Sequence, residues 1–173
     1  MPRTRIKICG LTRAQDVAAA VAAGADAIGF VFYAKSPRYV TAAAAAQLIS
    51  TVPPFVSTVG LFVNAGVEEV AVALQQAPLS LLQFHGDETP EQCAAIAAAV
   101  KRPFIRAARI GSSTTPADLI KYEQDYRSAS PYFTGLLLDT LVEQYGGSGK
   151  VFDWSLIPEE LAPRVVLSGG LSV

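Results

Sequence analysis

Short apolar runs alternate along the chain with longer segments in which apolar residues recur at helical spacing. Seven of the apolar runs predict strands, and they cover residues 5–10, 26–32, 56–63, 80–84, 103–108, 135–139 and 164–168. The segments between them predict helices near residues 13–24, 41–52, 67–76, 90–101 and 117–126, with a short sixth helix within 154–161. Residues 1–173 therefore form one domain in which strands and helices alternate.

Capping signals mark three ends of two predicted helices. Thr12 with Gln15 and Thr89 with Gln92 have the spacing of a capping box, which predicts a helix start in both places. Gly24 follows the first helix and is typical of a residue that ends one. These signals support the helix boundaries but indicate no function.

The predicted strands are apolar throughout and do not alternate between apolar and polar residues. This pattern is typical of a parallel sheet that is covered by helices. Strands that alternate with helices predict an α/β fold, which is either a doubly wound sheet or a closed barrel. The periodicity does not distinguish these two architectures.

The composition excludes several classes of protein. The chain has 14 basic and 15 acidic residues, and its formal net charge is −1, so it has no charge run that would attract nucleic acid or a membrane surface. Two cysteines are too few for a disulfide framework, which favours reduced thiols. No apolar run is long enough for a signal peptide or a membrane span. We therefore expect a cytoplasmic protein.

Polar residues gather at the carboxyl ends of the predicted strands, where parallel α/β proteins carry their sites. These candidate site residues are Lys7, Cys9, residues 36–38, Asn64, residues 85–87, Arg106, Arg109, Asp139, Thr140, Gly169 and Gly170.

Cys9 and Lys7 are the first candidates for chemistry. They are two residues apart in a strand, so their side chains point to the same face. A nearby ammonium stabilises a thiolate, which can act as a base or a nucleophile. The alternative is a small buried cysteine that fills space, as Cys93 does in its alanine-rich helix.

Asp139 ends the apolar run of residues 136–138. Partial removal from water favours the protonated carboxyl group that a general acid requires. The alternative is an aspartate that caps a helix or fixes a loop.

Two glycine-rich segments are candidates for contact with phosphate. Residues 146–150 lack the spacing of a nucleotide-binding loop but can form a flexible loop at the site. Gly169 and Gly170 directly follow a strand and can offer backbone N–H groups to an anion, although a tight turn also needs glycine. His85 is the single histidine, and it has no metal-ligand spacing with Cys9 or Cys93.

Six segments in the same order resemble the phosphoribosylanthranilate isomerase family, and the resemblance extends over nearly the whole chain. They are residues 7–13 (KICGLTR), 29–40 (with SPRYV), 59–64 (VGLFVN), 83–88 (QFHGDE), 138–154 (with LDT, GGSGK and FDW) and 167–171 (LSGGL). The resemblance implies a (βα)₈ TIM barrel and an aldose–ketose isomerisation, an Amadori rearrangement in tryptophan biosynthesis that uses no cofactor and no metal.

The resemblance also implies the roles of particular residues. Cys9 would be the general base, Asp139 the general acid, and Arg38 the partner of the anthranilate carboxylate. We further expect the substrate to contact Lys7, His85, Gly169 and Gly170. A small-molecule substrate is the expected partner, and the protein is expected to be a monomer or a homodimer.

The family pattern continues beyond residue 173 with a helix, an eighth strand and a last helix. We therefore expect a barrel that is incomplete at its carboxyl terminus, with open sheet edges on its first and last strands. Two alternatives remain open at this point. One is another sugar-phosphate barrel enzyme that uses Lys7 as a Schiff-base lysine, and the other is a non-catalytic fragment or assembly domain.

Overall fold

The computed structural model describes residues 3–140, 153–169 and 171. Seven strands and five α-helices alternate along the described residues. The strands are β1 (Lys7–Cys9), β2 (Ala27–Val31), β3 (Ser57–Phe62), β4 (Leu81–Phe84), β5 (Phe104–Ile110), β6 (Phe133–Thr140) and β7 (Val165–Leu167). The α-helices are α1 (Ala14–Ala22), α2 (Ala42–Ile49), α3 (Val67–Gln76), α4 (Pro90–Val100) and α5 (Pro116–Ala129).

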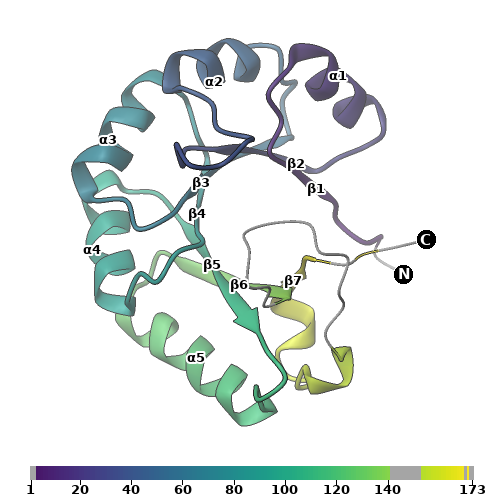
Figure 1. Ribbon diagram of the computed structural model, residues 1–173, viewed down its shortest axis with the longest axis vertical. Helices are drawn as coiled ribbons and strands as arrows, with labels where there is room; N and C mark the ends of the chain where they lie inside the picture. The colour runs from purple at the N-terminus through teal and green to yellow at the C-terminus, as the bar shows by residue number, and fades with distance from the viewer. Residues whose placement is uncertain (1–2, 141–152, 170, 172–173) are drawn as a thin grey trace.

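All seven strands are parallel, and their order in the sheet is their order in the sequence, from β1 to β7. A doubly wound sheet would reverse its strand order at some point, so the sequential order decides in favour of the barrel architecture. Figure 1 shows the sheet curved, with helices α1 to α5 along its convex side. The described residues contain no eighth strand, and β1 and β7 are the edges of this partial barrel.

Apolar side chains fill the layer between the sheet and the helices. Phe30, Phe62, Phe84 and Phe104 are fully buried in this layer, together with residues from all five α-helices. A smaller apolar cluster, made of Ile105, Ala107 and Leu137 with Leu81 packed against it, lies on the opposite face of the same strands. Burial on both faces explains why the strands read as continuous apolar runs.

Two of the predicted helix ends are confirmed and one is wrong. Thr89 and Gln92 form the capping box of α4. Gly24 has a φ of +86°, and the bonds from Gly24 N to Val21 O and from Ala25 N to Ala20 O form a Schellman motif after α1.

The capping box predicted at Thr12 does not form. Arg13 is the N-cap residue of α1, with no capping bond from its side chain. Its guanidinium donates two hydrogen bonds of 2.7 Å to the carboxylate of Asp16 in the first helical turn. A negative charge in this position also interacts favourably with the helix dipole, so an ion pair replaces the expected cap.

The short sixth helix predicted within residues 154–161 is present only as a 3₁₀ turn, Trp154–Leu156. Pro158 lacks the backbone N–H that a continuing helix needs, which explains why this helix is so short. A second 3₁₀ turn, Ala162–Arg164, follows outside the predicted range. No helix in the described ranges is long and apolar enough to cross a membrane.

Replacement of Phe104 by Ala should destabilise the fold. The Phe104 ring is fully buried and packs edge-on against Phe84 at 5.4 Å and against Phe133 at 5.6 Å between ring centroids. We expect Phe104→Ala to lower the free energy of unfolding by about 3–5 kcal/mol in urea denaturation. Phe55→Ala is the matched control, because the Phe55 side chain is fully exposed. Equal stability of the two variants would contradict the assigned core.

Candidate active site

The carboxyl ends of the parallel strands form one rim of the curved sheet, and most of the predicted site residues lie there. The structure brings these residues together in two groups. Lys7, Cys9 and Arg38 form one group, on β1 and the loop after β2. His85 and Asp139 form the other, at the ends of β4 and β6.

Lys7 and Cys9 form the first group with Gly29 of β2. The register pairs Lys7 with Ala27 and Cys9 with Gly29. A Cβ atom on Gly29 would lie 2.8 Å from the Cys9 sulfur and 3.3 Å from Lys7 Nζ. Both side chains therefore extend over the same glycine, which confirms that they share one face. A side chain at position 29 would displace the thiol.

Arg38 joins this group from the loop after β2. Its Nη1 donates a hydrogen bond of 3.2 Å to the carbonyl oxygen of Cys9. The guanidinium lies against Gly10, where a Cβ atom would be 2.6 Å from Arg38 Cδ, and Gly10 has a φ of +85°. Glycine is the residue that suits both this backbone conformation and this close approach. A positive fork-shaped group is thus held against the backbone of Cys9 and Gly10.

His85 and Asp139 form the second group. His85 Nε2 lies 3.2 Å from Asp139 Oδ2, and the two side chains are 17% and 27% exposed. On the other side of the ring, His85 Nδ1 lies 2.8 Å from the amide nitrogen of Gln83. A carboxyl group and an imidazole in contact, both open to solvent, can hold and move a proton.

Gly169 completes the second group after β7. Its φ is +77°, and a Cβ atom there would lie 2.5 Å from Asp139 Oδ1 and 3.2 Å from Thr140 Oγ1. The backbone of this turn therefore lies directly beside the carboxyl group. Gly170 and the predicted loop at residues 146–150 lie outside the described residues.

The loop after β4 is fixed by a buried ion pair. Glu88 and Arg106 are 3% and 4% exposed, and their charged groups are 3.5 Å apart. Glu88 also accepts hydrogen bonds from the backbone N–H groups of Asn64 and Gly86, at 2.7 and 2.9 Å. Arg106 donates to the carbonyl oxygens of Phe84, Ala107 and Gly86 and to the Tyr126 hydroxyl. Arg106 and Asn64 are therefore supports of the loop that carries His85, although their positions in the sequence made them candidate site residues.

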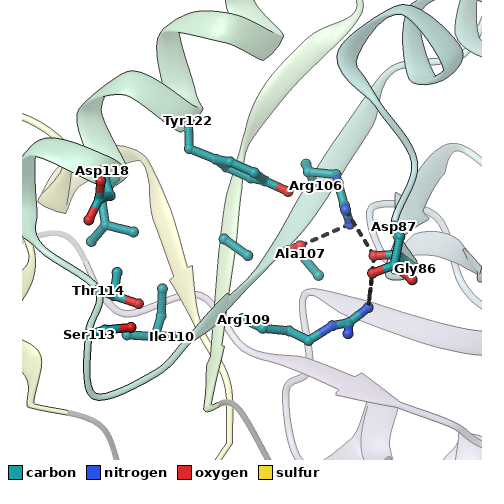
Figure 2. A pocket seen from close by; sticks show the side chains of 12 residues that line it. Gly86, Asp87, Arg106, Ala107, Arg109, Ile110, Ser113, Thr114, Asp118 and Tyr122 are labelled. Atoms are coloured by element: carbon teal, nitrogen blue, oxygen red, sulfur yellow. Dashed lines mark hydrogen bonds and ion pairs between the residues drawn. The ribbon is translucent and has the colours of Figure 1, made fainter.

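A cavity of about 390 Å³ opens beside this loop, between β5 and α5. Figure 2 shows Arg109 and Asp87 at one side of the cavity and Thr114, Asp118 and Tyr122 at the other. Arg109 Nη2 bonds to Asp87 Oδ1 and to the carbonyl oxygen of Gly86, both at 2.9 Å. These bonds tie the Arg109 guanidinium to the loop after β4.

The two cysteines differ in their surroundings. Cys9 is partly exposed at the rim, whereas Cys93 is fully buried in α4. Burial raises the pKa of the Cys93 thiol to about 12, an effect that the charge of Arg106 partly opposes. Cys93 therefore remains a neutral thiol at physiological pH, in agreement with its predicted role in the core. Within the described residues, no group of three or more His, Cys, Asp or Glu side chains could hold a metal ion.

Sequence reasoning missed Gln83 and Gly29 as residues of the site. Gln83 is 1% exposed inside a strand, and its signal in the sequence is a polar residue two positions before His85 in an apolar run. Gly29 looks like an ordinary small residue in a strand, and only the register with Cys9 shows why it is needed. Substrate contacts of Lys7, Arg38, His85 and Gly169 stay predictions.

The fold and the site define a class of protein. A sequentially ordered parallel sheet with a thiol, an ammonium, an imidazole and a carboxyl group at its carboxyl rim has the architecture of the TIM-barrel enzymes. The sequence model of the family described as N-(5'-phosphoribosyl)anthranilate (PRA) isomerase matches residues 6–173. The chain belongs to this family.

Individual proteins of this family are similar to the chain in sequence and in structure. The N-(5'-phosphoribosyl)anthranilate isomerase of Herminiimonas arsenicoxydans is 73% identical over 170 residues, which are 98% of this chain and 75% of the relative. The crystal structure of phosphoribosyl anthranilate isomerase from Thermotoga maritima aligns with a TM-score of 0.82 at 41% identity, covering 98% of this chain and 78% of that one.

A third similar protein is a phosphoribosyl anthranilate isomerase solved in complex with reduced 1-(o-carboxyphenylamino)-1-deoxyribulose 5-phosphate. It aligns with a TM-score of 0.78 at 37% identity, covering 98% of this chain and 77% of that one. The chain therefore has the fold of these isomerases and spans about three quarters of their length.

Replacement of Arg106 by Leu should destabilise the protein strongly, because it leaves the buried carboxylate of Glu88 without its charged partner. We expect a loss of about 3–5 kcal/mol in the free energy of unfolding, measured by urea denaturation. Arg13→Leu breaks an exposed ion pair and should leave stability unchanged within error. A mild effect of Arg106→Leu would show that Glu88 is held by its backbone bonds alone.

Proposed function

We propose that this chain converts N-(5-phosphoribosyl)anthranilate to 1-(2-carboxyphenylamino)-1-deoxy-D-ribulose 5-phosphate, with Asp139 as general acid and Cys9 as general base. The observation that carries this proposal is the presence of both groups on one rim of a barrel of this family. The rearrangement moves protons within a single substrate, so it requires no cofactor.

The acid acts first. Protonated Asp139 gives its proton to the ring oxygen of the furanose, the bond between this oxygen and C1 breaks, and the nitrogen lone pair forms a C1=N iminium. Asp139 is left as a carboxylate. Its contact with His85 Nε2 at 3.2 Å supports this role, because the imidazole can donate a hydrogen bond to the carboxylate that the step produces.

The base acts second. The Cys9 thiolate removes the proton from C2, and the electrons of the C–H bond neutralise the iminium to give an enolamine. Tautomerisation of the enolamine then gives the C2 ketone of the product. The Cys9 sulfur and Lys7 Nζ lie 2.8 and 3.3 Å from one point above Gly29, so the thiol and the ammonium face the same part of the rim, where the substrate would lie.

The remaining site residues would orient the substrate. The Arg38 guanidinium can pair with the anthranilate carboxylate through two parallel hydrogen bonds. The proposal assigns phosphate contacts to the backbone of Gly169 and Gly170, and substrate contacts to Lys7 and His85. The position of Gly169 directly after β7, at the carboxyl rim, supports part of this assignment.

The proposal extends to the setting of the enzyme. We expect one barrel domain that works in the cytoplasm, in agreement with two free cysteines. One solved relative is described as monomers generated from the dimeric phosphoribosylanthranilate isomerase of Thermotoga maritima, so this chain is proposed to act as a monomer or a homodimer.

Removal of either proposed catalytic group should abolish most turnover. We expect Cys9→Ser and Asp139→Asn to lower kcat by about 100-fold or more, because each loses a proton-transfer group. The assay follows the loss of anthranilate fluorescence, and far-UV circular dichroism checks the fold. Cys93→Ser and Asp125→Asn are matched controls away from the rim and should retain activity. Near-full activity of Cys9→Ser or Asp139→Asn would remove that residue from the mechanism.

Replacement of Arg38 by Ala should weaken substrate binding more than it slows the chemical steps. We expect KM to rise about tenfold or more, since a hydrogen-bonded ion pair to the substrate is lost, with a smaller change in kcat. Arg127→Ala removes an arginine of α5 that pairs with Glu123 and should leave KM unchanged. An unchanged KM in Arg38→Ala would exclude Arg38 from the carboxylate site.

A further inference from the structure

His85 is contacted by a side chain at each of its ring nitrogens. Gln83 Nε2 lies 2.8 Å from Nδ1, and Asp139 Oδ2 lies 3.2 Å from Nε2. We propose that Gln83 is a positioning residue for the acid: its amide N–H donates to Nδ1, which fixes the ring proton on Nε2, and His85 donates that proton to Asp139 as a hydrogen bond. The tautomer can be tested by itself, whereas its catalytic consequence rests on the proposed function of Asp139.

Gln83 is poorly explained as a stabilising residue. Its side chain is buried in β4 with Leu61 of β3 and Ile105 of β5 as its neighbours in the sheet. Its amide oxygen is buried and has no hydrogen-bond partner among the described residues. A buried polar atom without a partner lowers stability, and a leucine would fill the space without one. The contribution of the amide is therefore its bond to His85.

The geometry around His85 is fixed by the backbone. Gln83 and His85 are two residues apart at the end of β4, so their side chains point to the same face. The backbone N–H of His85 donates to the carbonyl oxygen of Phe62 at 2.9 Å. The ion pair of Glu88 and Arg106 holds the residues that follow. The imidazole therefore meets Asp139 from a supported position.

The tautomer decides how Asp139 can act. With the proton on Nε2, His85 occupies Oδ2 as a donor, and Oδ1 is left to carry the acid proton. When that proton passes to the furanose oxygen, the new carboxylate already has a hydrogen bond that stabilises it. With the proton on Nδ1, the bare Nε2 would instead accept the acid proton of Asp139 and hold it away from the substrate.

The tautomer can be read directly, because His85 is the single histidine of the chain. Nitrogen-15 NMR of histidine-labelled protein at about pH 8, where an imidazole is ordinarily neutral, distinguishes a protonated ring nitrogen from a bare one. The proposal requires a proton on Nε2 and none on Nδ1 in the wild-type protein. A proton on Nδ1 would overturn it, whatever the variants do.

Two variants test the role of Gln83. Gln83→Leu removes the donor, and we expect mixed tautomers and a kcat lowered by about tenfold or more, with KM within about twofold. Gln83→Glu replaces the donor with an acceptor of the same shape and should move the ring proton to Nδ1. The NMR spectrum of Gln83→Glu shows whether residue 83 sets the tautomer of His85, even if Gln83→Leu does not fold.

Thr58→Val is the control, since it removes a buried hydrogen bond to Pro78 at the other end of the strands. It should change neither the tautomer nor kcat. An unchanged tautomer in both Gln83 variants would overturn the proposal. If instead the tautomer responds while Asp139→Asn remains active, the positioning of His85 stands and the proposed acid is wrong.

Discussion

The pairing of consecutive parallel strands is the constraint on which the rest of the structure depends. Because each strand pairs with the next in the same direction, seven carboxyl ends meet on one rim. Cys9 on β1 and Asp139 on β6 are far apart in the sequence, and only this arrangement puts them at the same edge of the sheet. The helices stabilise the sheet by covering its convex side with apolar residues, and they leave the rim to polar groups.

Polar side chains below the rim hold the reactive ones in place. The buried pair of Glu88 and Arg106 fixes the loop after β4 through five hydrogen bonds to backbone groups of the surrounding segments. Gln83 meets the ring of His85 from inside the sheet. A buried ion pair is a poor source of net stability, so its value here lies in the geometry that it imposes on the β4 loop.

The local patterns of the sequence predicted most of the elements. Strand and helix positions follow from the spacing of apolar residues, and the shared face of Lys7 and Cys9 follows from the period of a strand. The capping box at Thr12 failed because Arg13 pairs with Asp16, a competition between side chains that spacing does not reveal.

The contact between His85 and Asp139 could not be predicted from local patterns, because it joins strands β4 and β6, which are not neighbours in the sheet. Gln83 was missed because an apolar strand buried on both faces does not reveal which residues point inward.

Gly29 has a consequence for redesign of this barrel. The space above it is occupied by the side chains of Cys9 and Lys7, so Gly29 of β2 cannot be replaced to reshape the site at this point. New specificity would have to come from the loops that follow the strands, where side chains can change without moving the thiol.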